Sequence, residues 1–112
     1  MSQFINYGID LGTTNSCIAF CDGNDVRIFQ NNDLMNVTPS VVRILKNNRT
    51  IVGKRAYNAI VDDSENVALE FKRWMGQKDQ KLFPVSGKLL SAEELSAKVL
   101  KSLKEDVHRQ TV

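Results

Sequence analysis

Signals for export, membrane insertion and covalent cross-linking are scarce in this 112-residue sequence. No apolar run approaches the ~18 residues of a membrane-spanning helix, and no basic segment precedes an apolar one as in a signal peptide. The only two cysteines, Cys17 and Cys21, lie four residues apart in an expected strand. That spacing places them on one face but roughly 13 Å apart, too far to bridge each other. We expect a cytoplasmic protein with no membrane partner, in which both cysteines are buried and act as small apolar side chains.

Strong charge of one sign is also lacking. Lys and Arg number 15 against 13 Asp and Glu, which gives a net charge of +2, and no basic run exceeds two residues. Because nucleic-acid-binding domains usually carry clustered basic residues, we expect no nucleic-acid partner. A hydrophobic share of 42% is ordinary for a globular chain, and this length fits one domain or part of one.

The segment 5–30 predicts an antiparallel β-meander. Apolar and β-branched residues gather in 5–11, 16–21 and 26–30. Asp22-Gly23-Asn24 separates the last two runs and is a strong hairpin signal, because Gly and Asn accept positive φ. An antiparallel start excludes the βαβ unit with which dinucleotide-binding folds begin.

The remaining chain mixes strands and helices, so the expected fold class is α/β in the broad, α+β sense. Strands are expected over 41–45 and 50–52, helices over 53–60 and 67–75, and a loop or short hairpin over 77–90.

A long C-terminal helix is the clearest element. Ser91 and Glu94 fit a capping box, in which each side chain accepts a hydrogen bond from the other residue's N–H group. Apolar residues then recur every four positions, which predicts a core-facing stripe. The stripe consists of Leu95, Val99, Leu103 and Val107.

The turn after the first strand carries the residues best suited to chemistry. Asp10 offers a hard oxygen ligand of the kind that suits a hydrated Mg²⁺. Gly12 lets the backbone come close to a ligand, and the turn's N–H groups with the Thr13 and Thr14 hydroxyls can bind an anion. The pattern matches neither a Walker loop nor a dinucleotide fingerprint. The alternative is a plain polar hairpin turn.

Four segments resemble, in the same order, the seventy-kilodalton heat-shock chaperones of the DnaK type. The first is 8–17, which contains the Gly-Thr-Thr turn. The second is Thr38-Pro39-Ser40 with the following valines and Val52-Gly53. The third is the Lys-Arg-x-x-Gly segment 71–76, and the fourth is the helix start 91–100. Together they cover essentially the whole chain.

The resemblance implies a fragment of an actin-like, ribonuclease-H-like ATPase fold, 1–112 being the N-terminal part of that domain. About 1–38 would form the first-lobe meander with its phosphate loop, and about 39–112 the start of the upper subdomain. By the same resemblance, the second phosphate loop, the adenosine pocket and the peptide-binding domain lie further along the family's sequence. We therefore expect this chain to be inactive alone.

The resemblance also implies roles for individual residues. Asp10 would hold Mg²⁺ through water, Lys72 would be the catalytic lysine, and the turn would surround the β- and γ-phosphates of ATP or ADP. The turn residues are Gly12, Thr13, Thr14 and Asn15. Because an ordinary lysine is a cation at neutral pH, Lys72 is better suited to stabilising phosphoryl charge and positioning water than to acting as a general base.

In the family, the implied partners are unfolded client peptides, a J-domain co-chaperone and a nucleotide exchange factor. This chain departs from the usual pattern at Trp74, Met75 and Gln77, and its connection 77–90 is short. These departures indicate a specialised bacterial paralogue of the Hsc type.

Two other functions fit parts of the sequence. Sugar kinases of the same superfold also open with a strand, an acidic residue and a Gly-Thr-Thr turn, although Thr38-Pro39-Ser40 and the Lys72-Arg73 segment argue against them. A non-catalytic interaction module is the second alternative. In that case, exposed strand edges would allow the chain to associate with itself.

Overall fold

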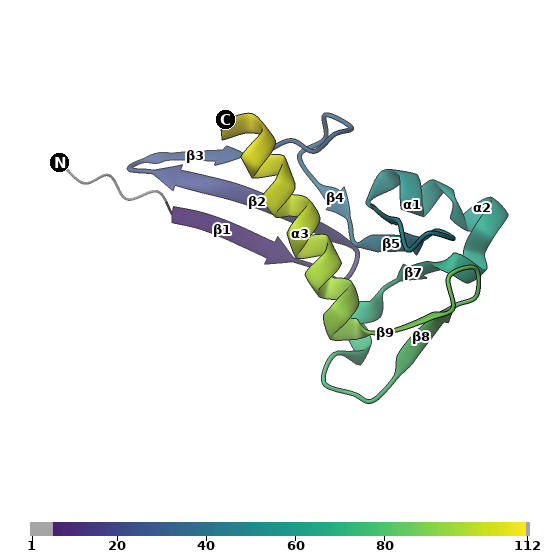
Figure 1. Ribbon diagram of the computed structural model, residues 1–112. Coiled ribbons are helices and arrows are strands. Elements are labelled where there is room, and N and C mark those ends of the chain that lie inside the picture. Colours follow the sequence, from purple (N-terminus) through teal and green to yellow (C-terminus); the bar gives the residue numbers. More distant parts are fainter. Residues whose placement is uncertain (1–5, 112) are drawn as a thin grey trace.

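The computed structural model describes residues 6–111, with only the backbone of Asp22 and Thr111. A long antiparallel sheet lies at one end of the molecule, a group of shorter strands and helices lies at the other, and one long helix crosses between them (Figure 1). This mixed α/β arrangement agrees with the expected fold class.

The long sheet is the predicted meander. Its antiparallel order is β1-β2-β3, and Gly23 makes the β2–β3 hairpin with φ 63°. Ile5, expected in the first strand, lies outside the described residues. A short fourth strand pairs with the beginning of β2 and was not anticipated from the sequence. The bounds are β1 Asn6–Leu11, β2 Asn15–Asp22, β3 Asp25–Ile28 and β4 Thr38–Pro39.

The second group is built on a three-stranded antiparallel sheet of order β6-β5-β7, followed by a separate β8–β9 hairpin. The hairpin confirms one of the two forms expected for 77–90. The strands are β5 Val41–Ile44, β6 Thr50–Val52, β7 Val67–Leu69, β8 Gln80–Phe83 and β9 Lys88–Ser91. The helices are α1 Lys54–Asn58, α2 Ile60–Asp63, the 3₁₀ turns η1 Ser64–Asn66 and η2 Phe71–Trp74, and α3 Ala92–Thr111.

The helix predicted over 67–75 is wrong. Its first residues form the strand β7, which pairs with the free edge of β5. The apolar spacing within 67–75 carries no information about that edge, because β5 lies far away in the sequence. Glu70 then takes the left-handed conformation, φ 55°, and the chain continues only as the 3₁₀ turn η2. The helix predicted over 53–60 is also inexact, since the structure divides it into α1 and α2 and carries α2 on to Asp63.

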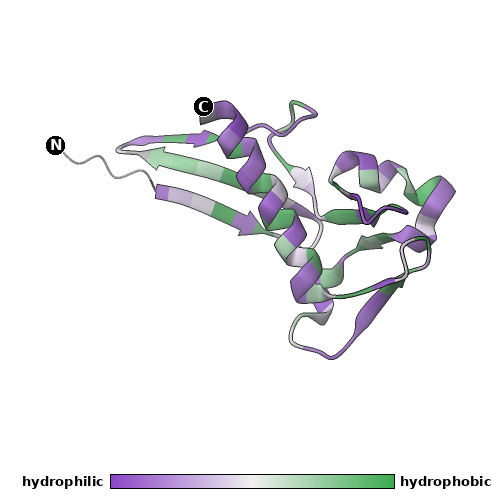
Figure 2. Ribbon diagram, in the orientation of Figure 1, coloured by the Kyte–Doolittle hydropathy of each residue, from purple (hydrophilic) through white to green (hydrophobic). Residues whose placement is uncertain are grey.

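Helix α3 supplies more of the core that holds the two groups together than any other element. Leu95, Val99 and Leu103 are buried, as the four-residue spacing predicts, and Val107 packs against them. The same cluster includes Ile18 of β2 and apolar residues of β5, η2 and β8. Figure 2 shows apolar residues concentrated in β2 and β5 beside this helix.

The capping box at the start of α3 is confirmed. The Ser91 N–H donates to Glu94 Oε1, and the Glu94 N–H donates to Ser91 Oγ, each at 3.1 Å. The helix therefore begins at Ala92, directly after β9, and the capping box satisfies the N–H groups of Ser91 and Glu94 at its start.

Cys17 and Cys21 are free thiols, as expected, but both are half-buried rather than buried. Neither lies in the apolar cluster around α3. Within residues 6–111, no helix has the length and apolar character needed to span a membrane.

Replacing a buried leucine of α3 should destabilise the fold far more than replacing an exposed one. Leu103 is 1% exposed and Leu100 is 37% exposed on the same helix. We expect Leu103→Ala to lower the free energy of unfolding by about 2–5 kcal/mol, because it leaves a cavity. Leu100→Ala should cost less than about 1 kcal/mol. Urea denaturation followed by circular dichroism measures both; equal losses would contradict the assigned role of α3.

Candidate phosphate-binding site

The turn between β1 and β2 is held tightly across its base. The Gly12 N–H donates to the carbonyl of Asn15 at 3.1 Å. A Cβ added at Gly12 would lie 2.4 Å from that same oxygen, closer than any side chain tolerates. Position 12 therefore accepts only glycine as long as the turn keeps this shape.

Ser40, which follows β4, holds the turn from the protein side. Its N–H donates to the Thr14 carbonyl at 2.9 Å, and its hydroxyl donates to the Gly12 carbonyl at 2.8 Å. The hydroxyl of Ser16 lies 2.7 Å from Ser40 Oγ, whose own proton is engaged, so Ser16 is the donor there. Ser40 and Ser16 are both buried. Two carbonyl groups of the turn are thus bound on the inner side.

The N–H groups of Thr13 and Thr14 are left available by this arrangement. Among residues 6–111, no acceptor takes the N–H or hydroxyl protons of Thr13 or Thr14, and Thr14 and Asn15 are exposed. Neighbouring free N–H groups in a tight turn form an anion-binding concavity, to which the hydroxyls add donors. The donor set therefore fits a phosphate group.

Asp10 lies next to this turn, on the sheet face opposite α3. It pairs with Cys17 in the β1–β2 register, while its neighbour Leu11 packs toward the core, and successive side chains of a strand alternate. The Asp10 carboxylate is exposed. In the described part of the chain, no three Asp, Glu, His or Cys side chains gather into a metal-binding group. A single carboxylate of this kind suits Mg²⁺ that keeps most of its water.

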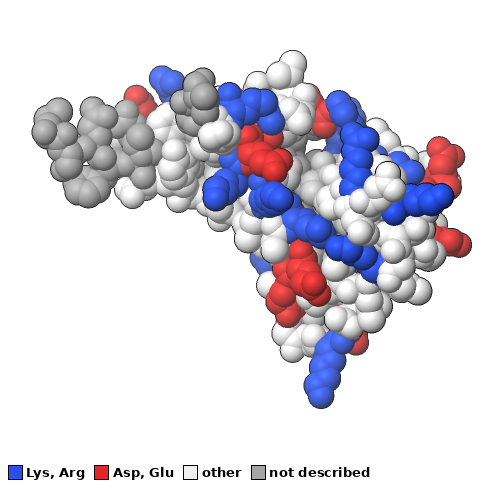
Figure 3. Space-filling view, in the orientation of Figure 1, with Lys and Arg blue, Asp and Glu red and all other residues white. Residues whose placement is uncertain are grey.

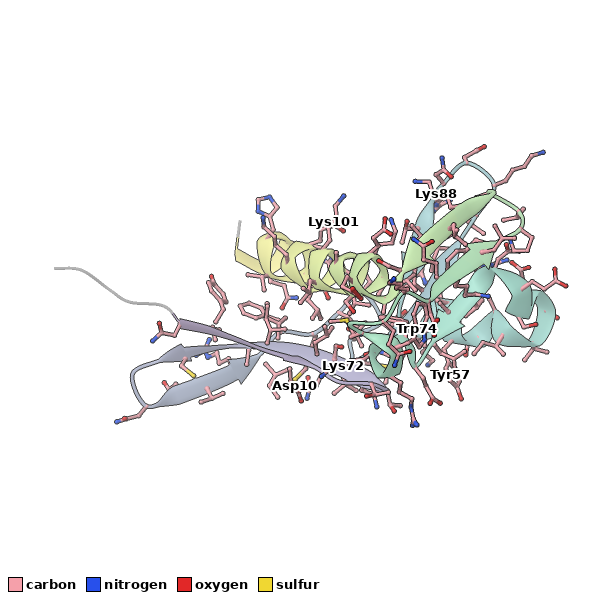
Figure 4. The ribbon with its side chains drawn as sticks, turned by 90° about the horizontal axis from the view of Figure 1, so that it is seen from below. Asp10, Tyr57, Lys72, Trp74, Lys88 and Lys101 are labelled. Carbon is pink, nitrogen blue, oxygen red and sulfur yellow. The ribbon has the colours of Figure 1, made fainter. Side chains whose placement is uncertain are left out.

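Lys72 reaches the same place from a distant part of the sequence. Its Nζ donates to the Leu11 carbonyl at 2.5 Å, although the two residues are 61 positions apart. Leu11 is the last residue of β1 and directly precedes Gly12. Figure 4 shows Asp10 and Lys72 close to each other below the long sheet, whereas Lys101 lies on the other side of α3. The structure thus brings the predicted site residues together.

The local backbone explains why Lys72 points outward. Glu70 turns the chain sharply at the end of β7, and the next residue, Phe71, is buried in the core at 2% exposure. Lys72 therefore leaves η2 away from the core. The side chain of Arg73 pairs with Glu70 at 2.8 Å, which holds this turn from outside.

Trp74 and Met75, which depart from the pattern of the family that the sequence resembles, both contact the rest of the fold. Trp74 packs against the apolar cluster, and Met75 Sδ accepts a hydrogen bond from Ser96 of α3 at 3.3 Å. These side chains thereby fasten η2, and with it Lys72, to the long helix.

Sequence reasoning did not assign a role to Ser40 or Gly53. Gly53 has φ 100°, and an added Cβ would lie 3.1 Å from Cγ2 of Thr38. The Thr-Pro-Ser segment and the later glycine are therefore neighbours in space, which gives a physical reason for their joint occurrence. Only the shared motif pattern pointed to them.

The family is decided by a comparison with known protein families. The family model described as Hsp70 protein matches residues 6–112, which include Asp10, the turn and Lys72. The chain belongs to the Hsp70 family. Proteins of this family bind nucleotide, generally with Mg²⁺, and the antiparallel sheets with a C-terminal helix are consistent with part of the Hsp70 actin-like ATPase domain.

A methyl group at Gly12 should damage the turn, whereas one in the middle of β1 should not. Gly12→Ala places its Cβ against the Asn15 carbonyl, while nothing lies within 4 Å of a Cβ at Gly8. We expect Gly12→Ala to lower the free energy of unfolding by about 1–3 kcal/mol. Gly8→Ala should change it by less than about 1 kcal/mol. Thermal denaturation compares them, and a harmless Gly12→Ala would show that the turn has another shape.

Proposed function

We propose that this chain provides one side of the ATP phosphate site of an Hsp70-type chaperone, which assists protein folding through ATP binding and hydrolysis. The observation that carries the proposal is the contact between Lys72 and the Leu11 carbonyl, which puts a cation at the base of a turn with free N–H groups. Lys72 is the catalytic residue of the proposal.

Each residue has a distinct part in this site. The N–H and hydroxyl groups of Thr13 and Thr14, with the Asn15 side chain, bind and orient the β- and γ-phosphates. Gly12 permits their close approach. Asp10 would hold Mg²⁺ through water, and the bound ion would neutralise phosphate charge. Lys72 stabilises the charge that spreads over the transferring phosphoryl group.

The wider proposal follows the family. The cofactors are ATP or ADP with Mg²⁺, and the partners are client peptides, a J-domain co-chaperone and a nucleotide exchange factor. Nucleotide turnover would shift the affinity for clients through a two-state equilibrium in the cytoplasm. The boundary near 38, between first-lobe meander and upper subdomain, is part of the proposal. The short 77–90 connection, folded as the β8–β9 hairpin, supports a specialised Hsc-type paralogue.

The affinity of this chain alone for nucleotide should be very low. Asp10, Thr14, Asn15 and Lys72 are all exposed, so water and salt compete with every contact they offer. We expect no ATPase activity, and a dissociation constant for Mg-ATP in roughly the millimolar range. Calorimetric titration should show no micromolar binding, and a micromolar constant would contradict this expectation.

The location of that weak binding tests the proposed site itself. In a ¹⁵N–¹H NMR titration with Mg-ATP, the amide signals of Gly12, Thr13, Thr14 and Asn15 should move together. Lys72→Ala should weaken the effect by about tenfold, because it removes a charge-assisted contact. Lys78→Ala, an exposed lysine outside the site, is the control. Shifts located elsewhere, or equal effects of the two variants, would argue against the assignment.

A further inference from the structure

A hollow lies on the side of α3 that faces away from the candidate site. Its volume is about 510 Å³, and its walls come from α3, α1, β6, the turn before β6 and the loop between β3 and β4. Figure 3 shows Lys and Arg side chains in a row across the face on which α3 lies. Figure 4 places Lys101 on this side, opposite Asp10 and Lys72.

Positive charge predominates in the hollow. Four basic residues contribute to its walls, and only Asp33 and Glu105 oppose them. The basic residues are Arg49 in the β5–β6 turn, Arg55 on α1, and Lys98 and Lys101 on α3. Because they come from three different elements, the fold itself, and not a basic run in the sequence, collects them.

Little within the described residues neutralises these cations. The side chains of Arg49 and Lys101 form no ion pair or hydrogen bond among residues 6–111. The contact of Arg55 Nε with Asp33 is long, at 3.8 Å, and Lys98 Nζ donates only to the Thr50 hydroxyl at 3.4 Å. Collected like charges raise the local concentration of anions, and a bound anion would relieve their repulsion.

The lining also indicates the type of anion. Apart from Ile51 and Val52 the walls are polar, and they include no aromatic side chain that could stack on a base. Guanidinium groups bind phosphate oxygens in pairs, and lysine adds a mobile point charge. The volume lies within the range of small-ligand pockets. We propose that this hollow binds a small anion carrying two or more phosphate groups, at a site separate from the Gly12 turn.

Binding there would connect parts of the fold that are far apart in the sequence. Lys98 and Lys101 lie on the helix whose other face forms the core, and Arg49 and Arg55 belong to the second group of elements. A ligand that contacts both would stabilise the packing of α3. This inference does not rest on the proposed nucleotide site, which lies on the other side of the helix.

Sodium tripolyphosphate is a suitable probe, used with EDTA so that no divalent cation is present. In a ¹⁵N–¹H NMR titration of the 112-residue chain, we expect saturable shifts of the amide signals around the hollow, namely those of Arg49, Arg55, Lys98 and Lys101. The apparent affinity should fall as salt is added, because the contacts are exposed.

Matched variants separate a real site from general attraction to basic side chains. Lys101→Gln and Arg49→Gln should each weaken binding by roughly three- to tenfold. Lys104→Gln on the same helix and Lys46→Gln in the same turn lie outside the hollow and should leave binding unchanged. All four side chains are exposed, so each variant should fold, and its spectrum outside the hollow verifies this.

Three results would overturn the inference. The first is shifts confined to Gly12–Asn15, which would assign the phosphate to the proposed nucleotide site. The second is shifts that spread over all lysines without saturating. The third is equal weakening by Lys101→Gln and Lys104→Gln.

Discussion

The hydrogen bonds of Ser40 join the two parts of the fold at the point where the proposed chemistry takes place. This buried residue binds the carbonyls of Gly12 and Thr14, and the N–H groups of Thr13 and Thr14 are left without an acceptor among residues 6–111. A hydrogen bond of this kind contributes about 0.5–1.5 kcal/mol to stability, so both bonds favour this orientation of the turn. Orientation of N–H groups is what converts an ordinary hairpin turn into an anion-binding one. The serine of the family's Thr-Pro-Ser pattern is thus the residue that holds the turn.

Helix α3 extends the same arrangement to Lys72. Its buried stripe fixes η2 through Phe71 and Trp74, and η2 in turn delivers the lysine to the Leu11 carbonyl. Two faces of one helix thus serve different purposes. The apolar face determines where the proposed catalytic cation lies, and the basic face forms one wall of the hollow that we propose binds phosphates.

The sequence predicted what depends on local patterns. The meander, the Gly23 hairpin and the Ser91–Glu94 capping box all follow from short-range chemistry, and each is present. The helix predicted over 67–75 is wrong, because the pairing of β7 with β5 overrides the helical spacing of its residues. Strand β4 was not predicted, because the residues of β2 with which it pairs lie more than twenty positions away in the sequence. Asp10 and the Gly-Thr-Thr turn were proposed from their chemistry, whereas Lys72 was predicted only from the family resemblance. Their convergence and the basic hollow depend on long-range packing, which spacing alone does not encode.

The backbone dynamics of the turn in Ser40→Ala test the central claim most directly. If Ser40 holds the turn, the ¹⁵N order parameters of Thr13 and Thr14 should fall from about 0.85, typical of rigid backbone, to below about 0.6 in the variant. Ser86→Ala is the control: it removes a serine hydroxyl that donates to the Phe83 carbonyl in the β8–β9 hairpin, outside the β1–β2 turn, and should leave that turn unchanged. The variant keeps the bond from the residue 40 N–H to the Thr14 carbonyl and loses the one from the Ser40 hydroxyl to the Gly12 carbonyl. A turn that stays equally rigid in Ser40→Ala would contradict the account, because its shape would then not depend on the Ser40 hydroxyl.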